Sequence, residues 1–125
     1  MYRIFYEKQN KIGISLEGEL DQNEFTDVLK RVSSKCEAYP QVDVLIDASQ
    51  ISDYNPDLVV DTYGTLIKHK DNIRKVAVLS NNGIGLYLKD LFKNFEDTSF
   101  QSFNVNELDK ARDWVLKPDP TRIFK

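Results

Sequence analysis

The chain has 125 residues, of which 41% are hydrophobic and 30% are charged, the size and composition of one globular domain. Its 17 basic and 20 acidic side chains give a net charge of −3, which is too mild and of the wrong sign for a general nucleic-acid binder. No apolar run approaches the roughly 20 residues of a membrane span, and the N-terminus lacks the basic-then-apolar layout of a signal peptide. Cys36 is the only cysteine, which excludes an internal disulfide, so we expect a reduced, cytoplasmic setting.

The chain opens with a predicted hairpin. Residues 2–6 (YRIFY) and 12–16 (IGISL) look like two strands joined by a polar turn. Asp21 has Glu24 three positions on, which is the spacing of a capping box at the start of a helix. Apolar residues then recur at helical spacing, so the first helix is expected to run to about Glu37.

The most informative stretch covers residues 42–58, VDVLIDASQISDYNPDL. It reads as a buried strand, a polar loop at 49–55 and a helix that begins at Pro56 and Asp57. Asn55 is a good N-cap, and proline is well tolerated in a first helical turn. Binding groups collect at such junctions in α/β proteins, because free N–H groups and the helix dipole point outward there. We therefore expect the working surface at this junction.

The remaining chain alternates helices and strands. Helical apolar spacing predicts helices over 58–67 and 84–95, and a last helix capped by Asn106; strands are expected at 76–79 and 99–103. The order ββαβαβαβα predicts an α/β fold with a mixed sheet of about five strands and four helices, since parallel neighbours need crossover connections.

The resulting domain plan has one domain and a short tail. Residues 1–117 are expected to form the domain, and residues 118–125, which contain two prolines, the tail.

This element order resembles the STAS domain, and within it the stand-alone SpoIIAA-like proteins, bacterial anti-sigma-factor antagonists. Four segments carry the resemblance: VDVLIDASQIS at 42–52, RKVAVLSNN at 74–82, LKDLFKNF at 88–95 and FNVNELDKARDWV at 103–115. The resemblance implies a SpoIIAA-like fold and a regulatory role through protein–protein contacts. None of the four segments is a catalytic signature.

The family's phosphoacceptor motif is not matched. Anti-sigma antagonists carry Asp-Ser-Ser-Gly at the start of the second helix, where a serine is phosphorylated. The corresponding residues here are Asn55, Pro56, Asp57 and Leu58, with no hydroxyl at the expected position. Asp57 is either a fixed mimic of the phosphorylated state or a residue that favours a helix N-terminus, and we favour the second interpretation.

Four aspartates form the densest acidic set: Asp47, Asp53, Asp57 and Asp61. Their spacing fits no calcium loop, so we expect capping and solvated roles, or contact with a basic partner, and no metal. The predicted partner-binding surface consists of Ser49, Ser52, Asp53, Tyr54, Asn55, Asp57 and Asp61.

Other chemical candidates are weak. Cys36 continues the apolar register of its helix and is expected to be a buried structural thiol, while His69 lies between two lysines with no evident acid partner. The segment 82–85 (NGIG) lacks the full spacing of a phosphate-binding loop. The sequence therefore predicts a protein that is not an enzyme and binds no cofactor.

An alternative function rests on apolar residues. The third helix is apolar on more of its surface than one buried stripe requires, which is typical of ordinary core, a ligand groove, a dimer interface or a membrane contact. A small apolar, lipid-like ligand between helices two and three would contact Tyr54, Tyr63, Leu86, Tyr87 and Phe92. A protein partner, this ligand and a homodimer thus remain open.

Overall fold

The computed structural model describes residues 1–53, 57, 64, 66–80, 88–90, 92–93 and 95–117. Its strands are β1 (Tyr2–Lys8), β2 (Lys11–Glu19), β3 (Val42–Asp53), β4 (Ile73–Leu79) and β5 (Ser99–Phe103). Its helical elements are α1 (Gln22–Ala38), the 3₁₀ helices η1 (Ile67–Asn72) and η2 (Val105–Glu107), and α4 (Leu108–Val115).

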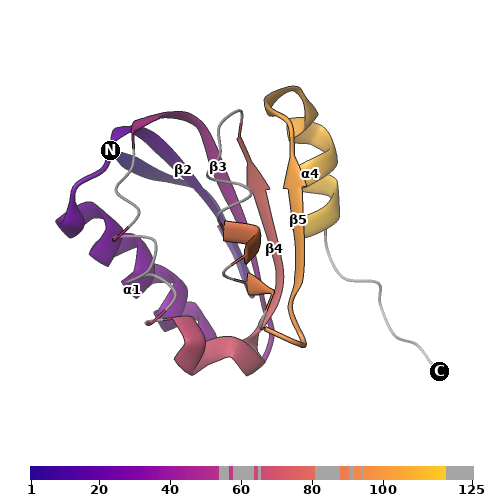
Figure 1. Ribbon diagram of the computed structural model, residues 1–125. Coiled ribbons are helices and arrows are strands. Elements are labelled where there is room, and N and C mark those ends of the chain that lie inside the picture. The colour runs from indigo at the N-terminus through magenta and orange to yellow at the C-terminus, as the bar shows by residue number, and fades with distance from the viewer. Residues whose placement is uncertain are drawn as a thin grey trace.

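The five strands form one mixed sheet in the order β1-β2-β3-β4-β5. β1 and β2 are antiparallel, and the pairs from β2 to β5 are parallel. α1 lies on one face of the sheet and α4 on the other (Figure 1). The predicted α/β class and mixed five-stranded sheet are therefore confirmed.

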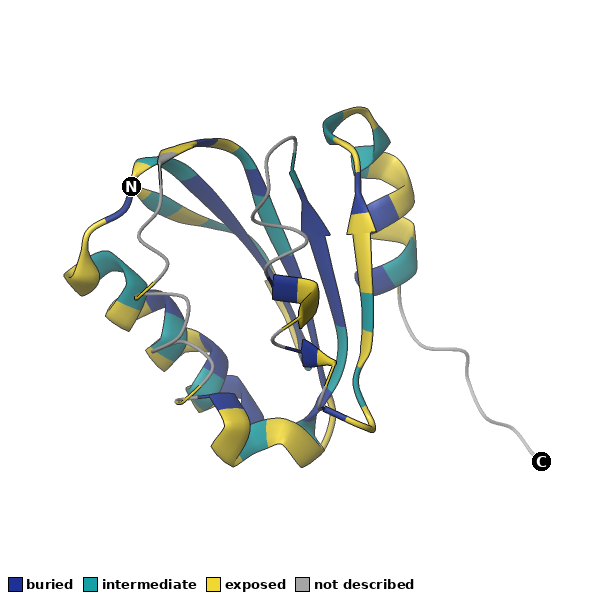
Figure 2. Ribbon diagram, in the orientation of Figure 1, coloured by how far each residue is buried: buried dark blue, intermediate teal, exposed yellow. Residues whose placement is uncertain are grey.

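The central strands are buried on both faces. In β3, Val42 and Val44 belong to the core under α1, whereas Leu45 belongs to the core under α4. β4 divides in the same way, with Val76 toward α1 and Ala77 toward α4. A parallel strand covered on both sides needs apolar residues at consecutive positions, which explains the continuous apolar runs in the sequence (Figure 2).

The first helix confirms the predicted capping box. The Asp21 carboxylate accepts a hydrogen bond from the backbone N–H of Glu24 at 2.8 Å, and the Glu24 carboxylate accepts from the N–H of Asp21 at 3.5 Å. The helix stops before Pro40, where the N–H of Tyr39 donates to the carbonyl of Lys35 at 3.0 Å.

The expected loop at 49–55 is wrong for its first five residues. β3 continues as a strand to Asp53, because β2 runs beside it to Glu19 and supplies partners, with Glu17 opposite Gln50 and Glu19 opposite Asp53. The polar composition of this segment predicted a loop, because local composition does not show pairing with a distant strand.

The expected N-cap of the last helix, Asn106, is also wrong. Asn104 is the N-cap of η2, and its N–H donates to the Glu107 carboxylate at 2.9 Å. The chain therefore turns helical two residues earlier, and η2 leads directly into α4.

The second and third helices are described only in part. Residues 57, 64 and 66 are helical where the second helix is expected, as are residues 88–90 and 92 for the third. Within the described residues, no helix is long and apolar enough to cross a membrane.

Candidate functional site

The carboxyl ends of β2 and β3 extend the sheet beyond the end of β4, and Met1 still pairs with Glu17 on the other side of β2. β3 pairs with β4 only as far as Asp47 opposite Leu79, but with β2 as far as Asp53 opposite Glu19. We call residues 17–19 and 50–53 the β2–β3 extension (Figure 1). It begins where the sequence predicted the working surface.

A local hydrogen-bond pair fixes the base of this extension. One carboxylate oxygen of Asp47, Oδ1, accepts from the backbone N–H of Ser49 at 3.0 Å and from its hydroxyl at 2.6 Å. Both side chains are half-buried. Asp47 therefore orients the backbone at the point where β3 leaves β4.

The structure places only some of the predicted partner-binding residues. Ser49 is half-buried, while Ser52 and Asp57 are exposed, and Asp57 is helical, in the region where the second helix is expected. The backbone of Asp53 pairs with Glu19. The other predicted residues, Tyr54, Asn55 and Asp61, lie outside the described residues.

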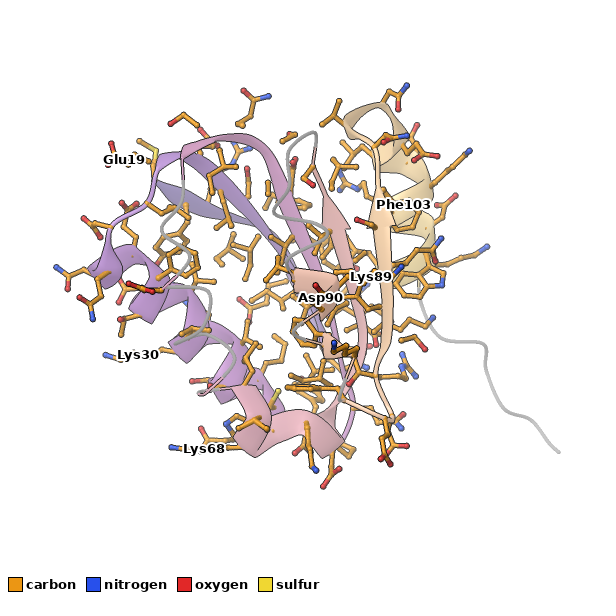
Figure 3. The ribbon with its side chains drawn as sticks, viewed as in Figure 1. Glu19, Lys30, Lys68, Lys89, Asp90 and Phe103 are labelled. Carbon is orange, nitrogen blue, oxygen red and sulfur yellow. The ribbon has the colours of Figure 1, made fainter. Side chains whose placement is uncertain are left out.

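Two acidic residues of this surface were missed in the sequence. Glu17 is half-buried and Glu19 is exposed at the end of β2 (Figure 3). Between them Gly18 has φ of +67°, a left-handed conformation in which a side chain is strained. The signal available was the Glu-Gly-Glu segment itself, but nothing local showed that it would lie beside residues 50–53.

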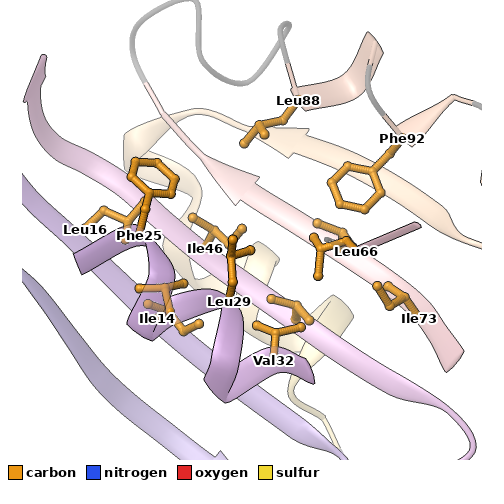
Figure 4. Close-up of a pocket in the computed structure, with 13 residues that line it drawn as sticks. Ile14, Leu16, Phe25, Leu29, Val32, Ile46, Leu66, Ile73, Leu88 and Phe92 are labelled. Carbon is orange, nitrogen blue, oxygen red and sulfur yellow. The ribbon is translucent and has the colours of Figure 1, made fainter. Parts of the chain in front are cut away.

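An apolar cavity lies between α1, the sheet and the described residues of the second and third helices (Figure 4). Phe25 and Leu29 of α1 face Leu88 and Phe92 across it, and Ile14 is among the sheet residues that line it. Its volume is about 50 Å³. An engineered apolar cavity of about 150 Å³ holds benzene, so the cavity among the described residues is smaller than a benzene site.

This cavity contains one predicted ligand residue, Phe92, which is buried. The remaining four, Tyr54, Tyr63, Leu86 and Tyr87, lie outside the described residues.

The single thiol is buried and protonated at neutral pH. Burial, together with the neighbouring Glu37 carboxylate, raises the pKa of Cys36 to about 11. A nucleophilic cysteine needs the opposite shift, so the expected structural role of this thiol is consistent with its surroundings. Within the described part of the chain, no group of three or more His, Cys, Asp or Glu side chains is placed to hold a metal.

A buried charge network at the opposite end of the sheet was also missed. The Asp43 carboxylate is fully buried, lies 2.5 Å from Lys11 Nζ, and accepts from Arg74 Nε at 2.9 Å. Lys11 Nζ also donates to the carbonyl of Val115, at the end of α4, at 3.2 Å. The network ties three strands to α4, and its position away from the β2–β3 extension indicates a structural role.

Comparisons with known proteins agree with this architecture. A sequence model described as SpoIIAA-like matches residues 11–116. An uncharacterized protein of the DUF3478 family from Shewanella loihica PV-4, with a SpoIIAA-like fold, is similar with a TM-score of 0.68 and 17% identity over 91% of this chain and 93% of that chain.

A second solved structure has the same fold. The anti-sigma factor antagonist SpoIIAA in its unphosphorylated form gives a TM-score of 0.52 and 14% identity, over 90% of this chain and 96% of that chain. At these identities the likeness shows the fold alone. Comparison with curated proteins finds no match.

Proposed function

The chain belongs to the SpoIIAA-like family, and from that premise we propose that it is a non-enzymatic regulatory module that acts by binding a protein partner. Its contact surface is residues 49–61 together with the β2–β3 extension. One structural relative is an anti-sigma factor antagonist, which supports a regulatory protein–protein role for this fold.

The observation that carries the proposal is the length of β3. Because β3 outruns β4, the ends of β2 and β3 stay paired beyond the last residue of β4, with Ile51 buried in the core and polar side chains exposed beside it. Glu19, Gln50 and Ser52 are exposed on the β2–β3 extension. A ribbon held by backbone pairing presents side chains in fixed positions, which lowers the entropy lost when a partner binds.

The charge of this surface indicates the chemistry of the partner. Glu17 and Glu19 add two carboxylates to the exposed Asp57 at the start of the second helix. We infer that the partner presents a basic surface, because opposite charges steer encounter and fix register. The partner's binding is then expected to weaken as salt rises.

Charge reversal tests the proposal. The wild-type chain, immobilised, is used to capture its partner from a lysate of its own host, and native mass spectrometry of the eluted complex gives the partner's mass and the stoichiometry. Asp57→Lys and Glu19→Lys should each abolish capture of that partner without lowering the thermal midpoint of the variant.

Asp113→Lys is the matched control. Asp113 is an exposed acid on α4, on the other face of the sheet, so its reversal changes net charge equally but leaves the proposed surface intact. Two results would contradict the proposal: capture that persists in both Asp57→Lys and Glu19→Lys, or an equal loss of capture in Asp113→Lys. A complex containing two copies of this chain alone would instead indicate a homodimer.

The apolar-ligand alternative has weaker support. The described cavity is lined by apolar side chains, but its volume of about 50 Å³ is small for a lipid. Extraction of the gently purified protein with organic solvent, followed by mass spectrometry, tests it directly. A stoichiometric apolar molecule would favour this alternative.

A further inference from the structure

A second pocket lies on the α4 face of the sheet, separate from the apolar cavity. Three of its lining residues form one row across neighbouring strands: Arg3 in β1 is opposite Ser15 in β2, and Ser15 is opposite Asp47 in β3. Directly paired residues project to the same face of a sheet, so this row presents a guanidinium, a hydroxyl and a carboxylate side by side.

α4 supplies the opposite wall. Leu108 and Arg112 are four residues apart and therefore lie on one face of the helix, directed at the row. The Arg112 guanidinium carbon stands 5.4 Å from the ring centroid of Phe5, which lines the same pocket. Cation–π contact with Phe5 holds Arg112 at the rim.

No residue that the structure describes neutralises the two guanidinium groups. Among the residues that the structure describes, neither Arg3 nor Arg112 forms an ion pair or a side-chain hydrogen bond. The carboxylates nearby are already engaged: Asp47 accepts from Ser49, and Glu17 lies 3.4 Å from the Ser15 hydroxyl. The pocket therefore offers two unpaired cations at its edge and acceptor oxygens at its floor.

This combination selects a ligand of mixed character. Guanidinium groups bind carboxylate and phosphate groups through paired N–H donors, whereas Asp47 repels an anion and accepts from a hydroxyl. The volume of about 140 Å³ is close to that of cavities that hold a benzene-sized molecule. We propose that this pocket binds a small organic anion in which a carboxylate or phosphate lies near a hydroxyl group.

Nuclear magnetic resonance titration of the full chain tests the proposal. The probes are glycerol 3-phosphate and glycerate, with inorganic phosphate and glycerol as comparisons that each lack one of the two features. The amide signals of Arg3, Ser15, Asp47 and Arg112 should shift and saturate with glycerol 3-phosphate or glycerate. Inorganic phosphate should bind more weakly, and glycerol should cause no saturable shift.

Substitutions separate the two halves of the pocket. Arg3→Gln and Arg112→Gln should each weaken binding by about tenfold, the usual effect of removing a hydrogen bond to a charged group. Asp47→Asn keeps an acceptor for Ser49 but removes the negative charge. This variant should bind inorganic phosphate more tightly than the wild type does. The ratio of its affinities for glycerol 3-phosphate and inorganic phosphate should therefore be smaller.

Arg31→Gln is the matched control, because Arg31 is an exposed arginine on α1. It should leave the affinity unchanged. Two results would overturn the proposal: the absence of saturable shifts in the pocket with both glycerol 3-phosphate and glycerate, or an equal loss of affinity in Arg31→Gln and Arg112→Gln. If a variant fails to fold, the titration of the wild-type protein still tests whether the pocket binds these anions.

Discussion

The ring of Phe5 in β1 lies directly against Gly13 in β2: a β-carbon placed at Gly13 would stand 2.8 Å from Phe5 Cζ. The pairing explains why. Ile4 is opposite Ile14 and Tyr6 is opposite Gly13, so β1 carries one extra residue, Phe5, at a β-bulge. Phe5 follows Arg3 by two residues and lies on the same face of the sheet, where its ring covers the glycine and contacts the Arg112 guanidinium. A residue with no side chain is thus what gives the second pocket its aromatic wall.

Adding a methyl group at Gly13 should therefore destabilise the fold. Gly13→Ala forces the Phe5 ring to move within a packed layer, which we expect to lower the free energy of unfolding by about 1–3 kcal/mol. Urea denaturation measures this loss. The ring signals of Phe5 should also shift in the NMR spectrum of the variant.

Gly64→Ala is the control for Gly13→Ala, because it makes the same reduction in backbone freedom at a site without a steric clash. Gly64 is helical and exposed, with no atom within 4 Å of an added β-carbon. Replacing a helical glycine by alanine should stabilise the protein by about 0.5–1 kcal/mol. The two substitutions should change the free energy of unfolding in opposite directions. A stabilising Gly13→Ala would contradict the proposed contact between Phe5 and Gly13.

Features that depend on neighbouring residues were predictable from the sequence. The capping box of Asp21 and Glu24 is a contact within one turn, and the alternation of strand and helix patterns gave the fold class. The same spacing is present in Asn104 and Glu107, so the sequence already contained the signal for the observed N-cap.

Features that depend on pairing between distant segments were not predictable. The continuation of β3 to Asp53 needs β2 beside it, and the bulge in β1 places Tyr6 on the same face of the sheet as Phe5. Asp43 stands between Val42 and Val44 in a strand covered on both faces, which was a usable signal for a buried charge. Its cationic partners come from 32 and 31 residues away in the chain.

Removal of the Asp43 carboxylate should destabilise the fold strongly. Asp43→Ala deprives the buried Lys11 ammonium of its anionic partner and leaves a space in the core, with an expected loss of about 3–5 kcal/mol in the free energy of unfolding. Asp113→Asn, at an exposed acid of α4, should change stability by less than about 0.5 kcal/mol. Urea denaturation compares the two variants.

A double replacement separates the cost of an unpaired charge from the value of the network. Lys11→Met combined with Asp43→Leu replaces the buried Lys11–Asp43 pair by apolar groups and leaves only Arg74, which is partly exposed to solvent, so we expect it to recover most of the stability that Asp43→Ala loses. If the double variant is as unstable as Asp43→Ala, the network contributes more than mutual charge compensation.

The N-cap of α1 offers a smaller, local test. Asp21→Ala removes the acceptor for the N–H of Glu24 and should cost about 1 kcal/mol. Asp27→Ala, at an exposed position inside the same helix, should be neutral or slightly stabilising, because alanine is the better helix former. Equal losses in thermal or urea denaturation would show that Asp21 contributes through its charge alone.

The buried thiol of Cys36 predicts a specific dependence of stability on pH. Its pKa is about 11 in the folded protein and 9.0 as the ordinary value, so the unfolded chain loses the thiol proton first as pH rises. The stabilising contribution is therefore complete below pH 9 and is lost as the pH rises toward 11. Cys36→Ala should remove this part of the slope, so urea denaturation between these pH values should show a shallower decline of stability in the variant than in the wild type.

The raised pKa of Cys36 also predicts slow reaction with a thiol reagent. At pH 8 the thiolate fraction of the folded protein is near one thousandth, roughly a hundredfold below that of the unfolded chain. The reagent should therefore label Cys36 slowly until denaturant is added. Rapid labelling of the folded protein, or identical pH slopes in the two proteins, would contradict the burial that places Cys36 in the core under α1.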